Sequence, residues 1–401
     1  MTRTPVVTRR EWAALAAIMT VAAILRLGWP GITEFKLDEA RVYSLALGLV
    51  EFRALPLTAT DMSVGLPNSP LAVYLYALPM FLWKSPLAPL LFGAALNTGA
   101  VALLYWLTRR YWGVRAALFA ALLYACAPWA VLYSRKIWAS NLLPLFLVGY
   151  VATGLLTFAD GRRRWVLPHL VLLSVIVQIH ISSLALAPVT AAMLLLQRKR
   201  LDWRWVGAGV AAALALEAPF LWYLATTTRA VGGGAAQVAG RGLQLSLDAV
   251  SLAAMVVEGT YTHSLAGPAA YQAFLATLPN FNPIFWIEAL LVLGGAGVLA
   301  LAGWRRGDLT PSGRAGALIG AWLLMPLAFF LVHVSPVYPH YLTIYFSVAF
   351  VLAGVALDWL LARTRTGWQR AAVSALPIII AAAQVWQVGA LLRFVDSQAT
   401  P

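Results

Sequence analysis

The run PLAPLLFGAALNTGAVALLYWL at residues 86–107 contains no charged side chain, and Arg109 and Arg110 follow it almost directly. A helix needs about 20 mostly apolar residues to cross the hydrocarbon core of a bilayer. This run therefore predicts a membrane span that ends in a basic turn. Across the 401 residues, 61% are apolar and only 11% are charged. Such a composition excludes a water-soluble enzyme and a disordered chain.

The same pattern recurs along the chain, and it predicts an all-α, polytopic integral membrane protein. The predicted spans, about eleven in number, are 11–28, 86–107, 115–133, 141–159, 165–180, 181–197, 204–226, 283–303, 315–334, 340–360 and 371–392. The segment 71–83 is shorter and contains Pro79, so we expect it to lie at the membrane interface instead of crossing. With no internal repeat or linker, residues 1–401 are expected to form a single membrane-embedded domain.

Most of the 29 basic residues gather in short clusters on alternate connections between the predicted spans. Because Lys and Arg accumulate on cytoplasmic loops, this pattern predicts a plasma-membrane protein with its N-terminus inside and its C-terminus outside. The same topology accounts for the net charge of +14 without a nucleic-acid partner. It leaves two long connections outside, 29–85 and 227–282. Loops on a rigid scaffold carry much of protein chemistry, so these two are expected to form an extracytoplasmic site.

The first candidate for chemistry is the stretch FKLDEAR at residues 35–41, shortly after the first predicted span. At the membrane edge, an ionised Asp38 beside Glu39 can accept a proton from a hydroxyl group as a general base. A structural explanation is also open. In it, Asp38 is the N-cap of an amphipathic interfacial helix over 40–52, and Glu39 adds a favourable interaction with the helix dipole. The two roles can coexist.

The second candidate is the stretch YSRKIW at residues 133–138. Arg135 and Lys136 lie on the predicted outer side, against the charge bias of the topology. Together they can clamp a lipid-linked phosphate, to which an arginine donates two parallel hydrogen bonds. The alternative is that both cations only reach the interface beside Tyr133 and Trp138.

Further candidates lie in two other predicted outer turns. His180 occupies the turn of a short hairpin, and His340 and Tyr341 follow a proline-containing turn. Polar groups between apolar runs are costly unless they are paired or hydrated, so these side chains are expected to line the same outer cavity. A structural histidine and a rigid proline turn are the alternatives. Weaker substrate-binding candidates in the long outer connections are Asp61, Tyr74, Glu258 and His263.

These motifs resemble those of the GT-C glycosyltransferases, in particular the protein O-mannosyltransferase and aminoarabinose-transferase group. The likeness begins with an Asp-Glu pair in the first outer connection and covers mainly the first half of the chain. The residues that carry it are Asp38-Glu39, Ser69-Pro70-Leu71, Tyr74, Arg109-Arg110, Gly113 and Tyr133-Ser134-Arg135. The resemblance implies a membrane enzyme with interfacial helices in its first outer loop.

The resemblance also implies a reaction. A hexosyl or pentosyl group passes from a polyprenyl-phosphate donor to a hydroxyl group of a protein, lipid or glycan acceptor, with inversion. Asp38 is the implied general base, and Glu39 orients it or binds the acceptor. Arg135, together with Lys136, neutralises the departing polyprenyl phosphate, and His340 and Tyr341 contact phosphate or sugar. No cofactor, nucleotide or obligatory metal is expected, although a divalent cation on the Asp-Glu pair suits carboxylate chemistry.

Two other classes of protein are alternatives to an enzyme. A flippase or transporter for lipid-linked sugars would carry polar residues through both halves of the membrane, whereas the polar candidates here gather at the outer side. A non-catalytic scaffold subunit would keep the fold without the chemistry. The presence of both Asp38 and Arg135 argues against that alternative.

Overall fold

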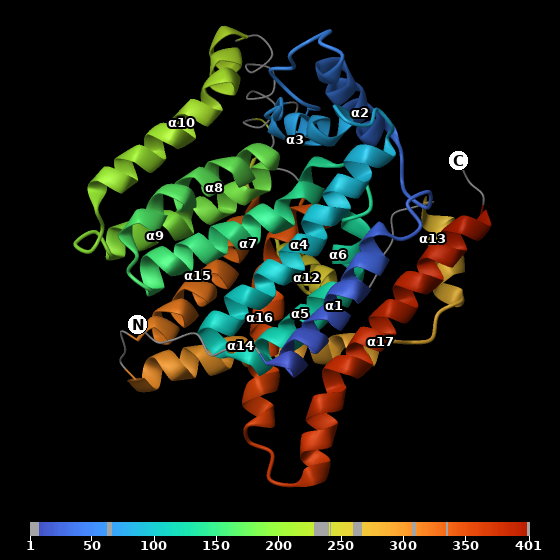
Figure 1. Ribbon diagram of the computed structural model, residues 1–401, viewed down its shortest axis with the longest axis vertical. Coiled ribbons are helices and arrows are strands. Elements are labelled where there is room, and N and C mark those ends of the chain that lie inside the picture. Colours follow the sequence, from blue (N-terminus) through green and yellow to red (C-terminus); the bar gives the residue numbers. More distant parts are fainter. Residues whose placement is uncertain are drawn as a thin grey trace.

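The computed structural model describes residues 8–61, 66–227, 240, 242–259, 267–306, 310–333 and 336–398. It is a bundle of helices, as Figure 1 shows, and the predicted all-α class is confirmed. The only strands within the described residues are β1 (Gln244–Leu245) and β2 (Val332–His333), which pair antiparallel. This short pair joins the second long outer connection to the end of a bundle helix.

Most of the described residues form α-helices, and five short 3₁₀ or π segments lie between some of them. In chain order the helices are α1 (Arg9–Leu27), α2 (Leu37–Val50), α3 (Leu71–Met80), α4 (Leu87–Trp112), α5 (Val114–Cys126), α6 (Pro128–Tyr133), α7 (Leu143–Gly154), α8 (Val166–Ile179), α9 (Ala187–Leu196), α10 (Trp203–Thr226), α12 (Asp248–Glu258), α13 (Gly267–Ala276), α14 (Asn282–Arg306), α15 (Pro311–Leu331), α16 (Phe346–Leu361) and α17 (Gly367–Gln398). The shorter segments are η1 (Ala139–Leu142), η2 (Leu155–Ala159), η3 (Arg163–Trp165), η4 (Ile181–Leu186) and η5 (Pro339–Tyr345).

The described residues contain seven helical stretches that are long and apolar enough to cross a membrane. They are Leu87–Trp112, Ala139–Ala159, Trp203–Thr226, Asn282–Ala302, Pro311–Leu331, Pro339–Leu361 and Gly367–Ser397. The other four predicted spans are also helical, but α1 carries charges at both ends, 115–133 breaks at Ala127, and the hairpin helices α8 and α9 are short. The chain is therefore a multi-pass membrane protein, while the count of eleven spans stays a prediction.

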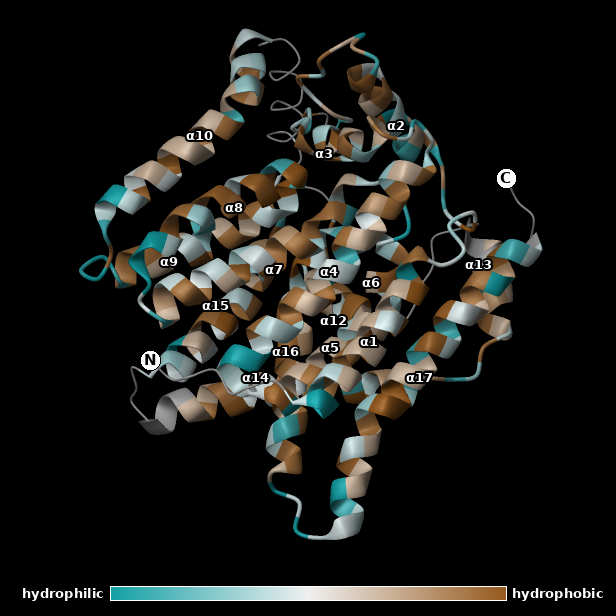
Figure 2. Cartoon of the chain, viewed as in Figure 1, coloured by the Kyte–Doolittle hydropathy of each residue, from teal (hydrophilic) through white to brown (hydrophobic). Residues whose placement is uncertain are grey.

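The centre of the bundle is α16, which is buried along nearly its whole length. A side chain at Gly354 would collide with the backbone carbonyl of Ala116 in α5, and one at Gly295 of α14 would collide with that of Leu352. Glycine at these two positions lets three helix backbones touch, as small residues commonly do between membrane helices. At the periphery, α10 packs chiefly on α8 and exposes large apolar side chains such as Trp222. In Figure 2 the bundle helices are dominated by hydrophobic residues, as expected for surfaces in lipid.

Ion pairs gather several basic connections at one end of the bundle, which we call the inner end. Arginines at the end of α4 bind the start of α1 and the end of η2, and an arginine at the start of α5 binds the end of α16. The pairs are Arg109–Glu11, Arg110–Asp160 and Arg115–Asp358. At the opposite end, the outer end, α2 and α3 cover the bundle in Figure 1. This separation agrees with the predicted sides, although the orientation in the membrane stays a prediction.

Candidate active site

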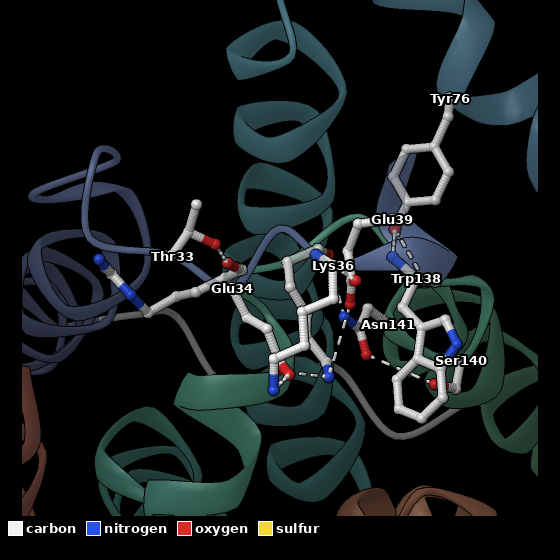
Figure 3. A network of polar contacts seen from close by, with 10 residues as sticks. Thr33, Glu34, Lys36, Glu39, Tyr76, Trp138, Ser140 and Asn141 are labelled. Carbon is white, nitrogen blue, oxygen red and sulfur yellow. Dashed lines mark hydrogen bonds and ion pairs between the residues drawn. The ribbon is translucent and has the colours of Figure 1, made fainter. Parts of the chain in front are cut away.

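Two of the predicted motifs meet at the outer end through ion pairs with one lysine. The ammonium of Lys136, which follows α6, lies 3.0 Å from Glu34 Oε2 and 3.8 Å from Glu39 Oε1. Glu34 precedes α2, and Glu39 lies in its first turn. Figure 3 shows this network, with Glu34, Glu39 and Trp138 turned toward a common centre. Segments 35–41 and 133–138 are thus in contact although about 100 residues separate them.

The two adjacent carboxylates of α2, Asp38 and Glu39, differ in burial and in hydrogen bonding. The helix begins after Lys36, whose backbone N–H donates to Glu39 Oε2 at 3.0 Å. Glu39 is buried and closes the first turn, whereas Asp38 is exposed and is not the N-cap. The structural explanation for Asp38 was therefore wrong, because the chain turns into the helix two residues earlier than a cap at Asp38 requires. Among the described residues, Asp38 has no hydrogen-bond or ion-pair partner, which leaves its carboxylate available.

The ammonium of Lys136 packs against two aromatic rings. Its ammonium lies 4.3 Å from the centre of the Trp138 ring and 5.9 Å from that of Tyr133. Only 11% of its side chain is exposed. A desolvated ammonium over an aromatic face gains electrostatic attraction from the ring. Lys136 is therefore a fixed cation at the centre of the network and does not simply reach into the interface.

The predicted histidines join the same network on the far side of Trp138. The ring of His340, in η5, lies 4.4 Å from that of Trp138 and 5.4 Å from that of His180. Tyr341 lies 5.5 Å from His180. Burial lowers the pKa of His180 to about 4, so its imidazole is neutral at physiological pH and can donate and accept hydrogen bonds. Lys136 and Trp138 thus connect the four predicted motifs into one site.

Arg135 occupies a different place from the one expected for a phosphate clamp. It is only 4% exposed, and its guanidinium donates to backbone carbonyls at the C-terminal end of α1 and in the loop that follows. The acceptors are the carbonyls of Leu25 (2.9 Å), Arg26 (3.5 Å), Gly28 (2.6 Å), Trp29 (2.8 Å) and Ile32 (3.2 Å). The expectation of a free phosphate-binding arginine therefore does not fit this geometry, since neighbouring carbonyls already occupy both terminal nitrogens.

The position of Arg135 has a physical explanation. The last carbonyls of a helix lack partners within the helix and carry partial negative charge, so a cation there is favourable. Burial lowers the pKa of Arg135 to about 10, which still leaves it charged at neutral pH. Arg26 caps the C-terminal end of α5 in the same way. It donates to the carbonyls of Ala125 (2.7 Å) and Tyr124 (3.0 Å). Arg26 ties the ends of α1 and α5 together, and Arg135 fixes the end of α1 and the loop that leads to Glu34 to the segment after α6.

Several residues that support the site were not predicted as part of it. Asn141 donates to the carbonyl of Lys136 at 2.9 Å, and Asn97 of α4 donates to the carbonyl of Asn141 at 2.7 Å. The hydroxyl of Tyr76 donates to the carbonyl of Trp138 at 2.8 Å. Asn97 is the only amide side chain in the uncharged run 86–107. A polar residue in such a run needs a partner, and this signal was available in the sequence.

The weaker candidates are scattered. Asp61 is exposed, and its backbone forms an isolated antiparallel β-bridge with Pro67. The hydroxyl of Tyr74 donates to the carbonyl of Pro56 and so ties α3 to the first part of the loop that precedes it. Glu258 is buried at the end of α12, and the carbonyl of the next residue, Gly259, accepts from Gln387 of α17. His263 lies outside the described residues.

The charges at the site nearly balance. Burial alone would raise the pKa of Glu34, but Lys136 and Lys36 outweigh it, so its pKa is lowered and the carboxylate is ionised at neutral pH. Lys36 pairs with Glu34 at 2.8 Å and remains well exposed. No group of three His, Cys, Asp or Glu side chains in the described part of the chain gathers as a metal site would require.

The fold of the chain is similar to that of known proteins, although its sequence matches none of them closely. No protein-family model matches the chain, and no curated protein matches its sequence. It is similar to ArnT from Cupriavidus metallidurans bound to undecaprenyl phosphate, with a TM-score of 0.59 and 15% identity over 97% of this chain and 76% of that one. It is also similar to the archaeal oligosaccharyltransferase AglB from Archaeoglobus fulgidus in complex with an inhibitory peptide and a dolichol-phosphate. That match has a TM-score of 0.59 and 14% identity over 97% of this chain.

These likenesses define the class of the protein by its fold. The chain has the GT-C fold of membrane glycosyltransferases, which confirms the resemblance drawn from its motifs. It spans 56% of the archaeal protein's length and 76% of the length of ArnT. At this level of identity the likeness is one of fold. The activity has to be argued from the site.

Proposed function

We propose that the protein is a glycosyltransferase that moves a sugar from a polyprenyl-phosphate donor to an acceptor hydroxyl at the extracytoplasmic face. The observation that carries this proposal is the contact between Glu39 and Lys136. The exposed carboxylate of Asp38 lies in the first turn of α2, and the next residue, Glu39, forms an ion pair with the largely buried ammonium of Lys136. A base and an anion-binding cation on neighbouring segments are what transfer from a phosphate leaving group requires.

The proposed step is a displacement with inversion at the anomeric carbon. The Asp38 carboxylate takes the proton from the acceptor hydroxyl as its oxygen forms a bond to that carbon. The bond between the anomeric carbon and the phosphate oxygen breaks, and the electron pair leaves with the polyprenyl phosphate. Lys136 stabilises the negative charge that this phosphate gains. Interactions aimed at charge that develops in the transition state are usually the largest contribution to catalysis.

Lys136 can exchange partners without leaving Glu34 unpaired, and Glu39 keeps the backbone N–H of Lys36. In the structure it is paired with Glu34, which also binds Lys36 at 2.8 Å. When the donor phosphate forms an ion pair with the ammonium of Lys136, Lys36 continues to neutralise Glu34. The neutral imidazole of His180, with His340 beside it, then offers hydrogen bonds to sugar or phosphate oxygens. The undecaprenyl phosphate and dolichol-phosphate of the two similar structures support a lipid-linked donor.

Sugar transfer itself is tested by donor consumption. The purified protein in lipid vesicles is given a panel of radiolabelled polyprenyl-phosphate sugars and a membrane extract as acceptor source. We expect one donor to yield labelled product and free polyprenyl phosphate in equal amounts. A flippase would move the donor across the vesicle membrane without consuming it, and a scaffold subunit would do neither. Movement without consumption would contradict the proposal.

Replacing Lys136 with glutamine is expected to lower the transfer rate by about 100-fold, because one preorganised charge stabiliser of a transition state contributes about that much. Lys136→Arg should retain part of the rate, since it keeps the charge. Rates are measured in single-turnover transfer assays. Lys84→Gln removes another lysine of the outer end, one that lies 3.7 Å from Glu51, and should stay near the wild-type rate. Equal losses in both glutamine variants would indicate a general effect of surface charge.

The reaction is expected to need no metal ion, because Lys136 supplies the positive charge at the leaving phosphate. Transfer in excess EDTA should therefore stay within about twofold of the untreated rate, whereas removing a catalytic divalent ion would forfeit several kcal/mol of charge stabilisation. The measurement is initial rate before and after chelation, followed by added Mg²⁺ or Mn²⁺. Loss of activity that these ions restore would assign a cation to Asp38 and the neighbouring glutamates instead.

A further inference from the structure

A groove of about 300 Å³ lies at the inner end of the bundle, away from the proposed active site. It is bordered by the end of α4, the start of α5, the end of α16, the start of α15 and the inner half of α14. Its apolar walls include Trp112, Val298, Leu299 and Val355. Its rim is polar and includes Ser312, Asp358 and Arg363. None of these residues takes part in the proposed transfer reaction.

The groove follows from how the three central helices cross. At Gly295 and Gly354 the backbones of α14, α16 and α5 touch. About one turn closer to the inner end, the same helices carry larger side chains, including Val298 and Leu299 on α14 and Trp359 on α16. Helices that meet at small residues are held apart where larger ones follow. The opening is therefore part of the packing of the bundle.

Among the described side chains, those at and beside the rim carry a net positive charge. The guanidinium carbon of Arg363 lies 3.7 Å from the centre of the Trp359 ring, and its Nη1 donates to the Trp359 carbonyl at 3.2 Å. Arg115 pairs with Asp358 at 2.6 Å, so this carboxylate is already neutralised. Residues at the start of α15 form another part of the rim, and the N-terminal end of a helix adds partial positive charge. An anion at the rim would meet Arg363 without displacing a paired acid.

We propose that this groove binds the headgroup of an anionic phospholipid of the inner leaflet. The phosphate lies between Arg363 and the start of α15, and the first carbons of the acyl chains follow the apolar walls. The volume suits a glycerophosphate group and not a whole phospholipid, so the chains continue along α14, where Leu301 is 54% exposed. A zwitterionic lipid would bind less tightly, because its own cation would be repelled by the cationic rim. A soluble phosphate would also bind less tightly, because it would leave the apolar walls of the groove uncovered.

The test is native mass spectrometry of the full-length protein, delipidated in detergent. It is mixed with equal concentrations of phosphatidylglycerol, phosphatidylcholine with the same chains, or glycerol phosphate. We expect one phosphatidylglycerol to be retained, about fivefold more tightly than phosphatidylcholine, because one basic residue near an anionic headgroup has about that effect. Glycerol phosphate should not be retained.

Two variants and a matched control locate the site. Arg363→Gln should abolish the preference for phosphatidylglycerol, and Ala302→Trp should fill the groove and abolish retention of both lipids. Arg370→Gln removes an exposed arginine of the same end, outside the groove lining, and should keep the preference. Melting temperature without added lipid shows that each variant is folded. Equal retention of the two lipids by the wild-type protein, an equal loss in Arg370→Gln, or tight binding of glycerol phosphate would each overturn the proposal.

Discussion

Replacing Asp38 with asparagine is expected to lower the rate of sugar transfer by about 10²–10⁴-fold, the usual contribution of a positioned general base. The amide cannot accept the proton of the acceptor hydroxyl. Asp38 is exposed, and its side chain makes no hydrogen bond or ion pair in the described part of the chain, so the fold and donor binding should be unaffected. Single-turnover transfer measures the rate, and donor binding and melting temperature are measured on the same preparation.

Glu51→Gln is the matched control for Asp38→Asn. It removes a carboxylate at the other end of α2, where Glu51 pairs with Arg53 and Lys84. We expect a near-normal rate, because a surface ion pair contributes little. Glu39→Gln is informative in another way, because the Glu39 side chain closes the first turn of the helix. Weakening this capping interaction should lower the melting temperature as well. Turnover at the wild-type rate in Asp38→Asn would remove the assignment of the base.

Replacing Arg135 with lysine is expected to lower the free energy of unfolding by about 2–4 kcal/mol and to reduce transfer at least tenfold. An ammonium cannot reach the carbonyls of Leu25, Gly28 and Trp29 together as the planar guanidinium does, and each lost hydrogen bond to a charged group costs about 1.5–3 kcal/mol. The loop that leads to Glu34 then loses its anchor. Thermal unfolding in detergent gives the stability, and transfer kinetics give kcat and the donor KM.

The kinetic pattern separates a positioning role for Arg135 from a phosphate-binding one. A loosened loop lowers kcat and stability together, whereas a lost phosphate contact raises the donor KM and leaves stability unchanged. Arg41→Lys, at an exposed position of α2, should change neither. If Arg135→Lys proved as stable as the wild type and changed only the donor KM, the phosphate clamp expected from the sequence would be reinstated.

The sequence predicted individual residues of the candidate site better than it predicted the contacts between them. Local patterns singled out Asp38, Lys136, His180 and His340, and the structure brings the last three together around Trp138. Glu34 belongs to none of the motifs that the sequence singled out. No spacing rule says which lysine an acidic residue will meet about 100 positions further along the chain, so its role became visible only in three dimensions.

The sequence alone determined that the chain is a multi-pass helical membrane protein, because apolar length and the need to pair every backbone group in lipid act locally on each segment. The order of the motifs also pointed to the GT-C fold. Only the tertiary structure decided which of two adjacent cations faces the site. Arg135 turns inward because the end of α1 packs against α6 and presents unpaired carbonyls to it, and Lys136 is left to face Glu34. That choice depends on how two distant helix ends approach each other, which residue spacing does not encode.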